Sequence, residues 1–419
     1  MRLFPVASAQ FVVREWRFLS FGLLIAFWSS PGQTYVISLF GTEIMAAFGL
    51  SHGGWGALYM YATVTSAVLL LFAGRLVDRY SVATMARGGV LALALAALCF
   101  PLAIGPVTLF LGFLGLRFTG QGMMSHISAT ALSRHYDRER GRAVAIGALG
   151  FSVGQAIFPP LVVFLLGHVD WWKIWTGFGV LALATTLPVI PFLLRTAPAP
   201  RALPAVDPAP DPVDDRQGDH WSVAQVLRDP RFYWLAPMMM GQSALGTALT
   251  FHQVHLVAMK GWSLSAWSAG YSVYAVVSIV ANLVAGVLID RYSARALTPF
   301  AVLPMALAFL VFAGLDNVAG AALVLGLSAI ATAGLNAGLT VLWVELYGTR
   351  NLGGVRSLSV FVRVFGSAIG PMAFGVALDQ GAGIGVLMSV SAGLIVAASA
   401  AAFVALYGPL GRRRGPPLP

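Results

Sequence analysis

Charged residues are scarce in this sequence of 419 residues. Only 10% of its residues are Asp, Glu, Lys or Arg, whereas 58% are hydrophobic, and the mean hydropathy is +0.80. A soluble domain carries roughly 25% charged residues, so this composition excludes an ordinary soluble protein. The single cysteine, Cys99, excludes an intrachain disulfide, and we interpret it as a small packing residue in an apolar run.

The sequence also lacks the groups that catalysis needs. It contains no Walker loop, no His/Cys cluster with metal-binding spacing and no strand–turn–helix context for a dinucleotide. No Asp or Glu occupies the middle of an apolar run, because Glu43, Glu345 and Asp379 all fall near the ends of such runs. We therefore predict no enzymatic activity, no cofactor and no metal. A lipid-modifying membrane enzyme would need embedded acids, bases or metal ligands that are missing here.

Long apolar runs fill most of the chain. A membrane-spanning helix needs about 20 mostly apolar residues, and twelve runs meet this length, with Gly and Pro in the gaps between them. We predict an all-α membrane protein with twelve transmembrane helices, at residues 18–42, 55–77, 84–104, 107–132, 143–167, 172–194, 233–257, 267–289, 297–315, 318–345, 355–378 and 383–407.

The net charge of +10 follows the loops rather than a nucleic-acid surface. With twelve spans, 22 of the 26 cationic residues fall on the face that holds both termini, while Lys173 and Lys260 alone fall on the other. Cytoplasmic loops carry such an excess of Lys and Arg. We therefore predict that both termini are cytoplasmic, that the protein lies in the inner (plasma) membrane with lipid as its surroundings, and that it binds no nucleic acid.

An internal repeat divides the chain. Residues 73–81 read AGRLVDRYS and residues 285–293 read AGVLIDRYS, an offset of 285 − 73 = 212 that also maps Trp55 onto Trp267 and Gly154 onto Gly366. Because six spans preserve orientation, the halves are parallel repeats. We predict two six-helix bundles, residues 1–195 and 232–419, joined by a Pro- and Asp-rich cytoplasmic linker at 196–231.

Several segments resemble one transporter family. GRLVDRYSVATMAR after span two, GVLIDRYSARA after span eight and RFTGQGMM in span four resemble motifs of the major facilitator superfamily. SRHYDRERGRAVAIGALGFSVGQAIFPP and WSVAQVLRDPRFYW are most similar to its branch of monocarboxylate transporters and oxalate/formate antiporters. Members of that branch often have a cation in span eight, whereas this sequence has no charged residue between Ala266 and Ile289. The resemblance implies two bundles around a central cavity surrounded by spans one, four, seven and ten, working as a monomer.

The repeated loop motif predicts a conformational latch. Small residues allow close helix packing, and carboxylates at these positions can accept hydrogen bonds from helix N-termini or pair with arginine. Such contacts can hold one conformation and release in another, although a static surface ion pair is the alternative. The predicted latch residues are Gly74, Asp78, Arg79, Gly286, Asp290 and Arg291.

Two arginines fall inside spans and suggest the charge of the solute. Arg363 stands about 13 Å deep and Arg117 about 16 Å deep in a hydrocarbon core of ~30 Å. A buried arginine is costly unless it is paired or faces water, so each either binds an anionic solute or bonds to backbone carbonyls and amides. With them, the polar residues Gln33, Tyr35, Gln121, Gln242 and Asn336 form our predicted solute site, with Thr34, Gln155, Gln253 and Asn282 as further polar groups.

Proton coupling is the less defined part of the prediction. His126, His252 and His255 titrate near neutral pH, and Glu43 lies near the outer mouth. We consider His126, His252 and Glu43 as candidates for coupling to H+. The leading hypothesis is a secondary active transporter of a small, monocarboxylate-like organic anion that works by alternating access. The alternatives are an efflux transporter for neutral or amphiphilic compounds and a solute sensor that does not transport.

Overall fold

The computed structural model describes residues 6–136, 139–195, 221–409 and 411, with side chains from residue 10 onward except those of 75–78. Within these ranges the chain forms helices joined by turns and short loops, and no strand occurs there. Residues 196–220 of the predicted linker, and the side chain of Asp78, lie outside this description.

The described residues divide into two compact units. The first takes its residues from Met1–Gly49 and Tyr61–Pro204, and the second from Leu50–Met60 and Ala205–Pro419. The helix α4 is continuous from His52 to Arg79, so it begins in the second unit and ends in the first. The predicted boundaries of the two bundles stay a prediction.

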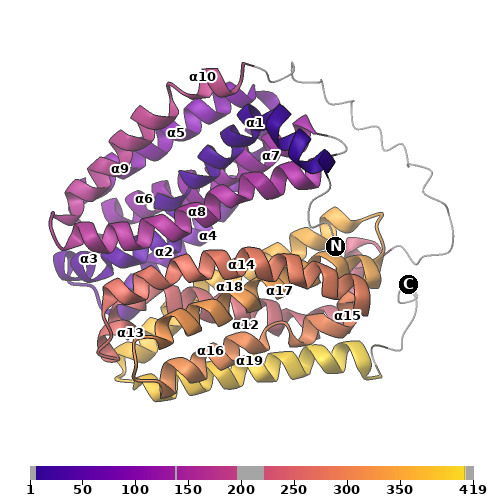
Figure 1. Cartoon of the computed structure of the whole chain (residues 1–419). Coiled ribbons are helices and arrows are strands. Elements are labelled where there is room, and N and C mark those ends of the chain that lie inside the picture. Colours follow the sequence, from indigo (N-terminus) through magenta and orange to yellow (C-terminus); the bar gives the residue numbers. More distant parts are fainter. Residues whose placement is uncertain (1–5, 137–138, 196–220, 410, 412–419) are drawn as a thin grey trace. The chain divides into compact units, whose positions relative to one another are not determined.

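The described part of the first unit contains nine helices besides the later part of α4, and Figure 1 colours them indigo to magenta. Helix α8 packs along α1 and α7, and α9 packs along α5. Their bounds are α1 (Val6–Phe27), α2 (Thr34–Ile37), α3 (Gly41–Phe48), α5 (Val82–Cys99), α6 (Pro106–Leu116), α7 (Ser125–His135), α8 (Arg140–Leu166), α9 (Trp171–Thr186) and α10 (Ile190–Leu193).

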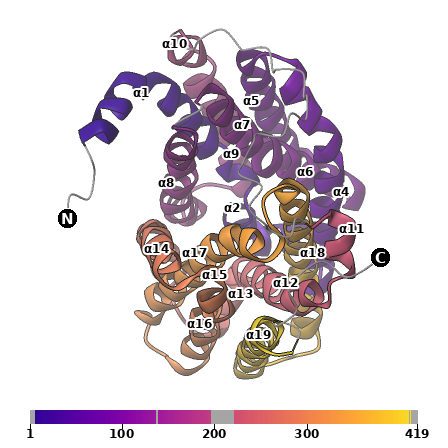
Figure 2. The ribbon, with the colours of Figure 1, turned by 90° about the vertical axis from the view of Figure 1, so that its right-hand side faces the viewer.

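In the second unit, α14 packs along α17 and α12 along α18, while α16 and α19 pack on each other. Figure 2 shows this unit end-on, with α14 and α18 toward opposite sides of the unit and α16 and α19 at its lower side. The bounds are α11 (Val223–Arg228), α12 (Pro230–Phe251), α13 (Gln253–Met259), α14 (Leu264–Tyr292), α15 (Ala294–Leu297), α16 (Leu303–Gly314), α17 (Gly320–Tyr347), α18 (Leu352–Asp379) and α19 (Ile384–Tyr407).

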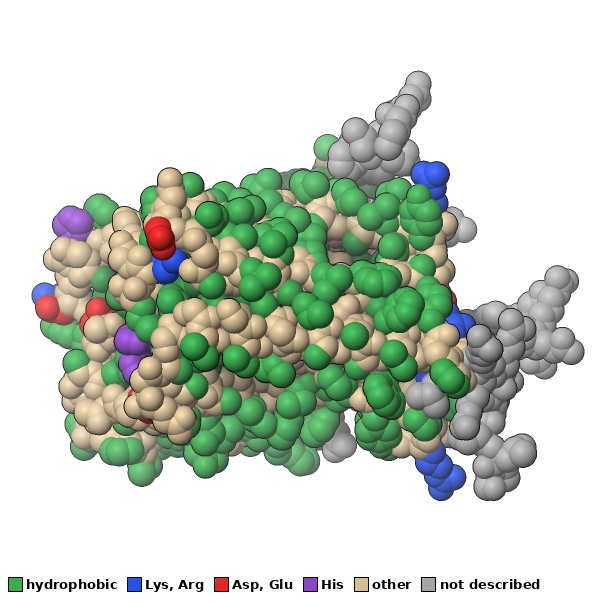
Figure 3. Space-filling view, turned by 90° about the horizontal axis from the view of Figure 1, so that it is seen from below, with side chains coloured by type: hydrophobic (Ala, Val, Ile, Leu, Met, Phe, Trp, Pro, Cys, Tyr) green, Lys and Arg blue, Asp and Glu red, His purple; other side chains and the backbone are tan. Residues whose placement is uncertain are grey.

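Nine segments of the described chain are long and apolar enough to cross a membrane, in agreement with nine of the predicted spans. On the face shown in Figure 3, hydrophobic side chains cover the middle and ionisable side chains gather toward the two ends. Helix α14 illustrates the apolar surface, since Val276, Leu283 and Val287 are each more than 60% exposed. These features identify a multi-pass membrane protein, because a lipid-facing helix exposes apolar side chains to hydrocarbon.

The other three predicted spans, one, four and seven, are interrupted helices. Span one breaks after Phe27, where Pro31 and Gly32 form a short 3₁₀ turn before α2 begins. Span four contains a π-helical segment, Arg117–Met124, between α6 and α7. Span seven breaks at His252, between α12 and α13. The sequence predicted each as a single span, and breaks of this kind occur in membranes where they are buried in protein or line a cavity.

Two glycines that are equivalent in the repeat lie at close helix contacts, one in each unit. A Cβ atom at Gly154 of α8 would meet Ser30 and lie 3.2 Å from the carbonyl oxygen of Phe27. The repeat maps Gly154 onto Gly366 of α18, where a Cβ would lie 2.6 Å from the carbonyl oxygen of Met240. Both glycines therefore allow the same kind of backbone approach, between α8 and the end of α1 and between α18 and α12.

Candidate functional site

Arg117 is buried in the first unit against the interruption of span one. Its side chain is 1% exposed, and its Nη1 donates to the carbonyl oxygen of Gly32 and to Oγ1 of Thr34, both at 3.3 Å. Gly120, in the same π-helical segment, allows this approach, because a Cβ there would lie 2.7 Å from the Cα of Gly32. The break leaves backbone groups without helical partners, and the guanidinium binds one of them. This geometry favours the structural role for Arg117, and its binding of a solute stays a prediction.

The other predicted solute residues of the first unit are bonded locally or exposed. Gln33 is buried, and its Nε2 donates to Oγ of Ser29 at 3.3 Å. The hydroxyl of buried Tyr35 donates to Oγ of Ser30 at 3.0 Å. Gln121 is exposed. The structure thus ties Gln33 and Tyr35 to the broken segment of span one.

Arg363 lies in a polar cluster within the second unit. Its side chain is half-buried on α18, and its Nε is buried without a hydrogen-bond partner among the described residues. Tyr274 of α14 lies near the guanidinium of Arg363 and near Thr332 of α17. The Nε2 of buried Gln242, on α12, donates to Oγ1 of Thr332 at 3.0 Å. Four helices therefore meet at this cluster, which consists of Gln242, Tyr274, Thr332 and Arg363.

The backbone of Arg363 is also fixed. Its carbonyl oxygen accepts a hydrogen bond of 2.7 Å from Oγ of Ser243, and Gly366, one turn later, brings α18 against α12. Asn336, a predicted site residue, lies half-buried on α17 one turn after Thr332. Gln253, in contrast, accepts from the indole of Trp267 and the hydroxyl of Tyr271, at 2.8 and 2.9 Å, and Asn282 is exposed.

Sequence reasoning missed Tyr274 and Thr332. Both stand in long apolar runs, where an isolated hydroxyl-bearing residue is itself a weak signal that the position faces other protein groups. Only the packing of α14, α17 and α18 brings them to Arg363.

The predicted latch residues other than Asp78, whose side chain is not described, make few contacts with the described residues in this conformation. A Cβ atom at Gly286 would meet nothing within 4 Å, and one at Gly74 would lie 3.7 Å from Nε2 of His126. Asp290 and Arg291 are exposed, and the guanidinium of Arg291 lies 5.3 Å from the ring centroid of Tyr292. Arg79 is exposed as well. The latch therefore stays a prediction for both copies.

A different carboxylate binds the helix end next to the second copy. Glu345 of α17 accepts hydrogen bonds from the amides of Ala294 and Arg295, at 2.8 and 3.0 Å. These amides open α15, directly after the motif. The bond that the sequence assigned to Asp290 as a candidate is thus made in this unit by Glu345, and its carboxylate stabilises the positive end of the short helix.

The candidate proton carriers have different surroundings. His252 is 3% exposed, and its Nε2 lies 2.8 Å from the carbonyl oxygen of Pro371. His126 is half-buried, and Glu43 keeps one buried carboxylate oxygen that has no hydrogen-bond partner among the described residues. Their role in proton coupling stays a prediction.

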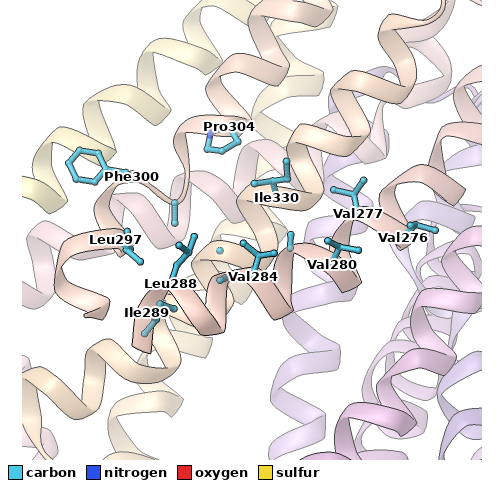
Figure 4. Close-up of a pocket in the computed structure, with 15 residues that line it drawn as sticks. Val276, Val277, Val280, Val284, Leu288, Ile289, Leu297, Phe300, Pro304 and Ile330 are labelled. Carbon is cyan, nitrogen blue, oxygen red and sulfur yellow. The ribbon is translucent and has the colours of Figure 1, made fainter. Parts of the chain in front are cut away.

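A cavity of about 530 Å³ opens beside α14 in the second unit. Figure 4 shows apolar side chains around it, among them Val280, Val284 and Leu288 of α14, Ile330 of α17, and Phe300 of the 3₁₀ turn before α16. Gly334 and Gly338 of α17 form part of its wall. None of the predicted solute residues lines it, so it differs in chemistry from the Arg363 cluster and suits an apolar group.

Known proteins share both the sequence pattern and the fold. The model of the Major Facilitator Superfamily matches residues 22–371. A bacterial homolog of the human lysosomal transporter Spinster, in an inward-facing and unoccupied conformation, is 17% identical, with a TM-score of 0.70 over 96% of this chain and 98% of that one. A variant of the nucleoside transporter NupG is 15% identical, with a TM-score of 0.69 over 93% of this chain and 100% of that one. No curated protein matches the sequence.

Proposed function

The chain belongs to the major facilitator superfamily, and we propose that it is a secondary active transporter of a small organic anion. It is a multi-pass membrane transporter and not an enzyme. In our proposal the two six-helix bundles, residues 1–195 and 232–419, alternate access to a midplane site while both termini stay in the cytoplasm. The transporter acts as a monomer in the inner membrane and uses H+ as its coupling ion.

The main support for an anionic solute is the position of Arg363. Its Nε is buried without a hydrogen-bond partner among the described residues. Arginine presents five donors in a fixed fork and binds carboxylates in a bidentate manner. A monocarboxylate would supply the missing acceptor and neutralise the charge, which is expensive to leave unpaired inside a membrane. The hydroxyl of Tyr274 and the amides of Gln242 and Asn336 would orient the rest of the solute.

Uptake into proteoliposomes tests this proposal. The panel contains short monocarboxylates, oxalate, formate and uncharged compounds, each with and without a pH gradient. A nucleoside belongs among the uncharged compounds, since one structural neighbour is a nucleoside transporter. We expect uptake of at least one anion, stimulation by the gradient and competition among anions. No stimulation by any anion would remove the proposal.

Replacement of Arg363 separates the role of this residue from general damage. Arg363→Gln should lower the affinity for the anion about 10- to 150-fold, the range expected for a lost charge-assisted hydrogen bond of about 1.5–3 kcal/mol. Arg356→Gln is a matched control on the same helix, because Arg356 is exposed and donates to the carbonyl oxygen of Thr340 at 3.2 Å. Equal uptake by both variants would contradict a direct contact of Arg363 with the solute.

The apolar cavity supports a second candidate, efflux of neutral or amphiphilic compounds. Ligand sites of about 300–1,000 Å³ with apolar walls suit drug-sized molecules, and the cavity of about 530 Å³ falls in this range. Gly334→Leu would fill it from the wall without touching Arg363. If amphiphile efflux is the function, this variant should lose transport while Arg363→Gln keeps it.

A further inference from the structure

The amino end of α4 is docked on α18 within the second unit. The amides of His52 and Gly53 donate to Oδ1 and Oδ2 of Asp379, at 2.9 and 2.8 Å. These are the first amides of α4, and the helix itself offers no acceptor for their hydrogen bonds. Asp379 is the last residue of α18. One carboxylate thus joins the start of one long helix to the end of another, 326 residues later in the chain.

Glycines and aromatic rings complete this docking. A Cβ atom at Gly56 would lie 2.6 Å from Cα of Met372, and one at Gly375 would meet the backbone of His52. Trp55 stacks on Phe251 with ring centroids 5.1 Å apart, and Tyr59 lies 4.5 Å from the same ring. The docked surface is therefore specific and closely packed, and any wedge or repulsion inside it would oppose docking.

A pair of histidines lies at the edge of the docked surface. The ring of His52 lies 4.1 Å from that of His255 on α13, and 5.9 Å from that of His252. The Nδ1 of His52 is buried and has no hydrogen-bond partner among the described residues. The titratable groups that face the pair are His252, whose Nε2 is occupied by the carbonyl of Pro371, and Asp379. The pair thus has one acidic neighbour for two rings.

We propose that His52 and His255 form a proton-binding site whose second proton releases the amino end of α4. Asp379 can balance one imidazolium, but a second positive charge would face the first across the short distance between the rings. A cation at the start of α4 is also opposed by the positive end of its helix dipole. The docked state therefore holds at most one proton on the pair, and the released state holds two at acidic pH. By the predicted orientation this site faces the outside of the cell.

The link to transport rests on the proposed function, since α4 continues from the second unit into the first. If the protein transports by alternating access, release of the amino end of α4 is one conformational step of the transport cycle, and external protons would favour it. The protons then act on the conformational equilibrium and need no contact with the solute.

Hydrogen exchange of the full-length protein in nanodiscs measures the release directly. Exchange rates of a peptide covering residues 51–60, divided by the intrinsic rates at each pH, give the opening equilibrium. Uptake of one extra proton on opening raises this equilibrium by up to about tenfold per pH unit. We expect such a rise between pH 6.5 and 5.5 in the wild type and none in His255→Asn. His168→Asn, a control on an exposed ring that contacts the carbonyl of Phe164, should respond like the wild type.

Two further variants keep the test decisive. His52→Asn should also lose the pH response, so the pair is examined even where one variant is poorly produced. Asp379→Asn should increase opening at both pH values, because the amides lose a charged acceptor. An equal pH response in the wild type and in both histidine variants would overturn the proton site. Exchange does not depend on the solute, so a proton response without anion uptake would remove the proposed function and leave the site standing.

Discussion

The two arginines buried within the spans, Arg117 and Arg363, are alike in sequence and differ in surroundings. Arg117 donates to Gly32 and Thr34 at the break of span one and is 1% exposed. Arg363 is half-buried and keeps an Nε that has no partner among the described residues. A cation that is almost fully buried and bonded to the break of span one is part of the structure, whereas a half-buried cation can still be reached by a solute. The comparison assigns stability to the first unit's arginine and recognition to the second's.

The largest expected effect comes from removing the bonded arginine. Arg117→Met leaves the carbonyl of Gly32 without its donor and disturbs the contact between Gly32 and Gly120. An unsatisfied buried acceptor costs about 1–3 kcal/mol, which corresponds to a roughly 5- to 150-fold change in the folding equilibrium. The melting temperature of the purified protein in detergent should fall clearly. An unchanged melting temperature would contradict the structural role of Arg117.

The corresponding replacement of Arg363 tests the other half of the comparison between the two arginines. Arg363→Met removes an incompletely bonded cation from the cluster and puts an apolar side chain of similar length in its place. Replacing buried charged groups by hydrophobic ones is often neutral or stabilising. We expect an unchanged or higher melting temperature together with loss of anion uptake. A fall in melting temperature as large as that of Arg117→Met would show that Arg363, too, is structural.

The sequence could predict the spans but not this difference. Apolar length and loop charge suffice to locate helices such as α14 and α18, because each depends on local composition. Pro31 and Gly32 stand at the break of span one, a span that the sequence alone predicts as continuous, and the choice of Arg117 as the partner of this break depends on a contact 85 residues apart. In the same way, Tyr274 lies near Arg363, and Thr332 near Tyr274, only through the packing of three helices. Contacts made across helices are set by tertiary structure, which local patterns do not report.

Two glycines extend the comparison from charges to packing. Gly366→Ala places a methyl group 2.6 Å from the carbonyl oxygen of Met240, whereas Gly286→Ala places one in open space. We expect the first variant to lose stability. The second should keep or gain it, since alanine is more favourable in helices by up to about 1 kcal/mol. Reduced uptake by a stable Gly286→Ala would support the latch, because the methyl group would then clash only in another conformation.

Transport by Gly286→Ala needs its own control. Gly385→Ala, in α19, also places a methyl group where nothing lies within 4 Å, and it is outside both motif copies. Equal uptake by the two variants and the wild type would remove the latch role of Gly286. Both variants are compared at equal amounts of reconstituted protein.

The smallest effect is expected at a cation that does have an acidic partner. The Nζ of Lys260 donates to Oδ1 of Asp316 at 2.7 Å and to the carbonyl oxygen of Ala313 at 3.0 Å. The hydrogen bond from Lys260 lowers the pKa of Asp316 below its ordinary value of 3.8, and the charge of Lys260 adds to this. A lowered pKa stabilises the folded state above the ordinary pKa, and the gain is lost as the pH falls through the lowered value. Because Asp316 is fully exposed, solvent screens the pair, and Lys260 keeps the Ala313 carbonyl as an acceptor. Asp316→Asn should therefore shift the melting temperature only slightly, and by the same amount at pH 8 and pH 5, since both lie above the titration. A large or pH-dependent shift of the melting temperature over this range would contradict this expectation, because the exposed Asp316 would then contribute more to stability than the buried arginines.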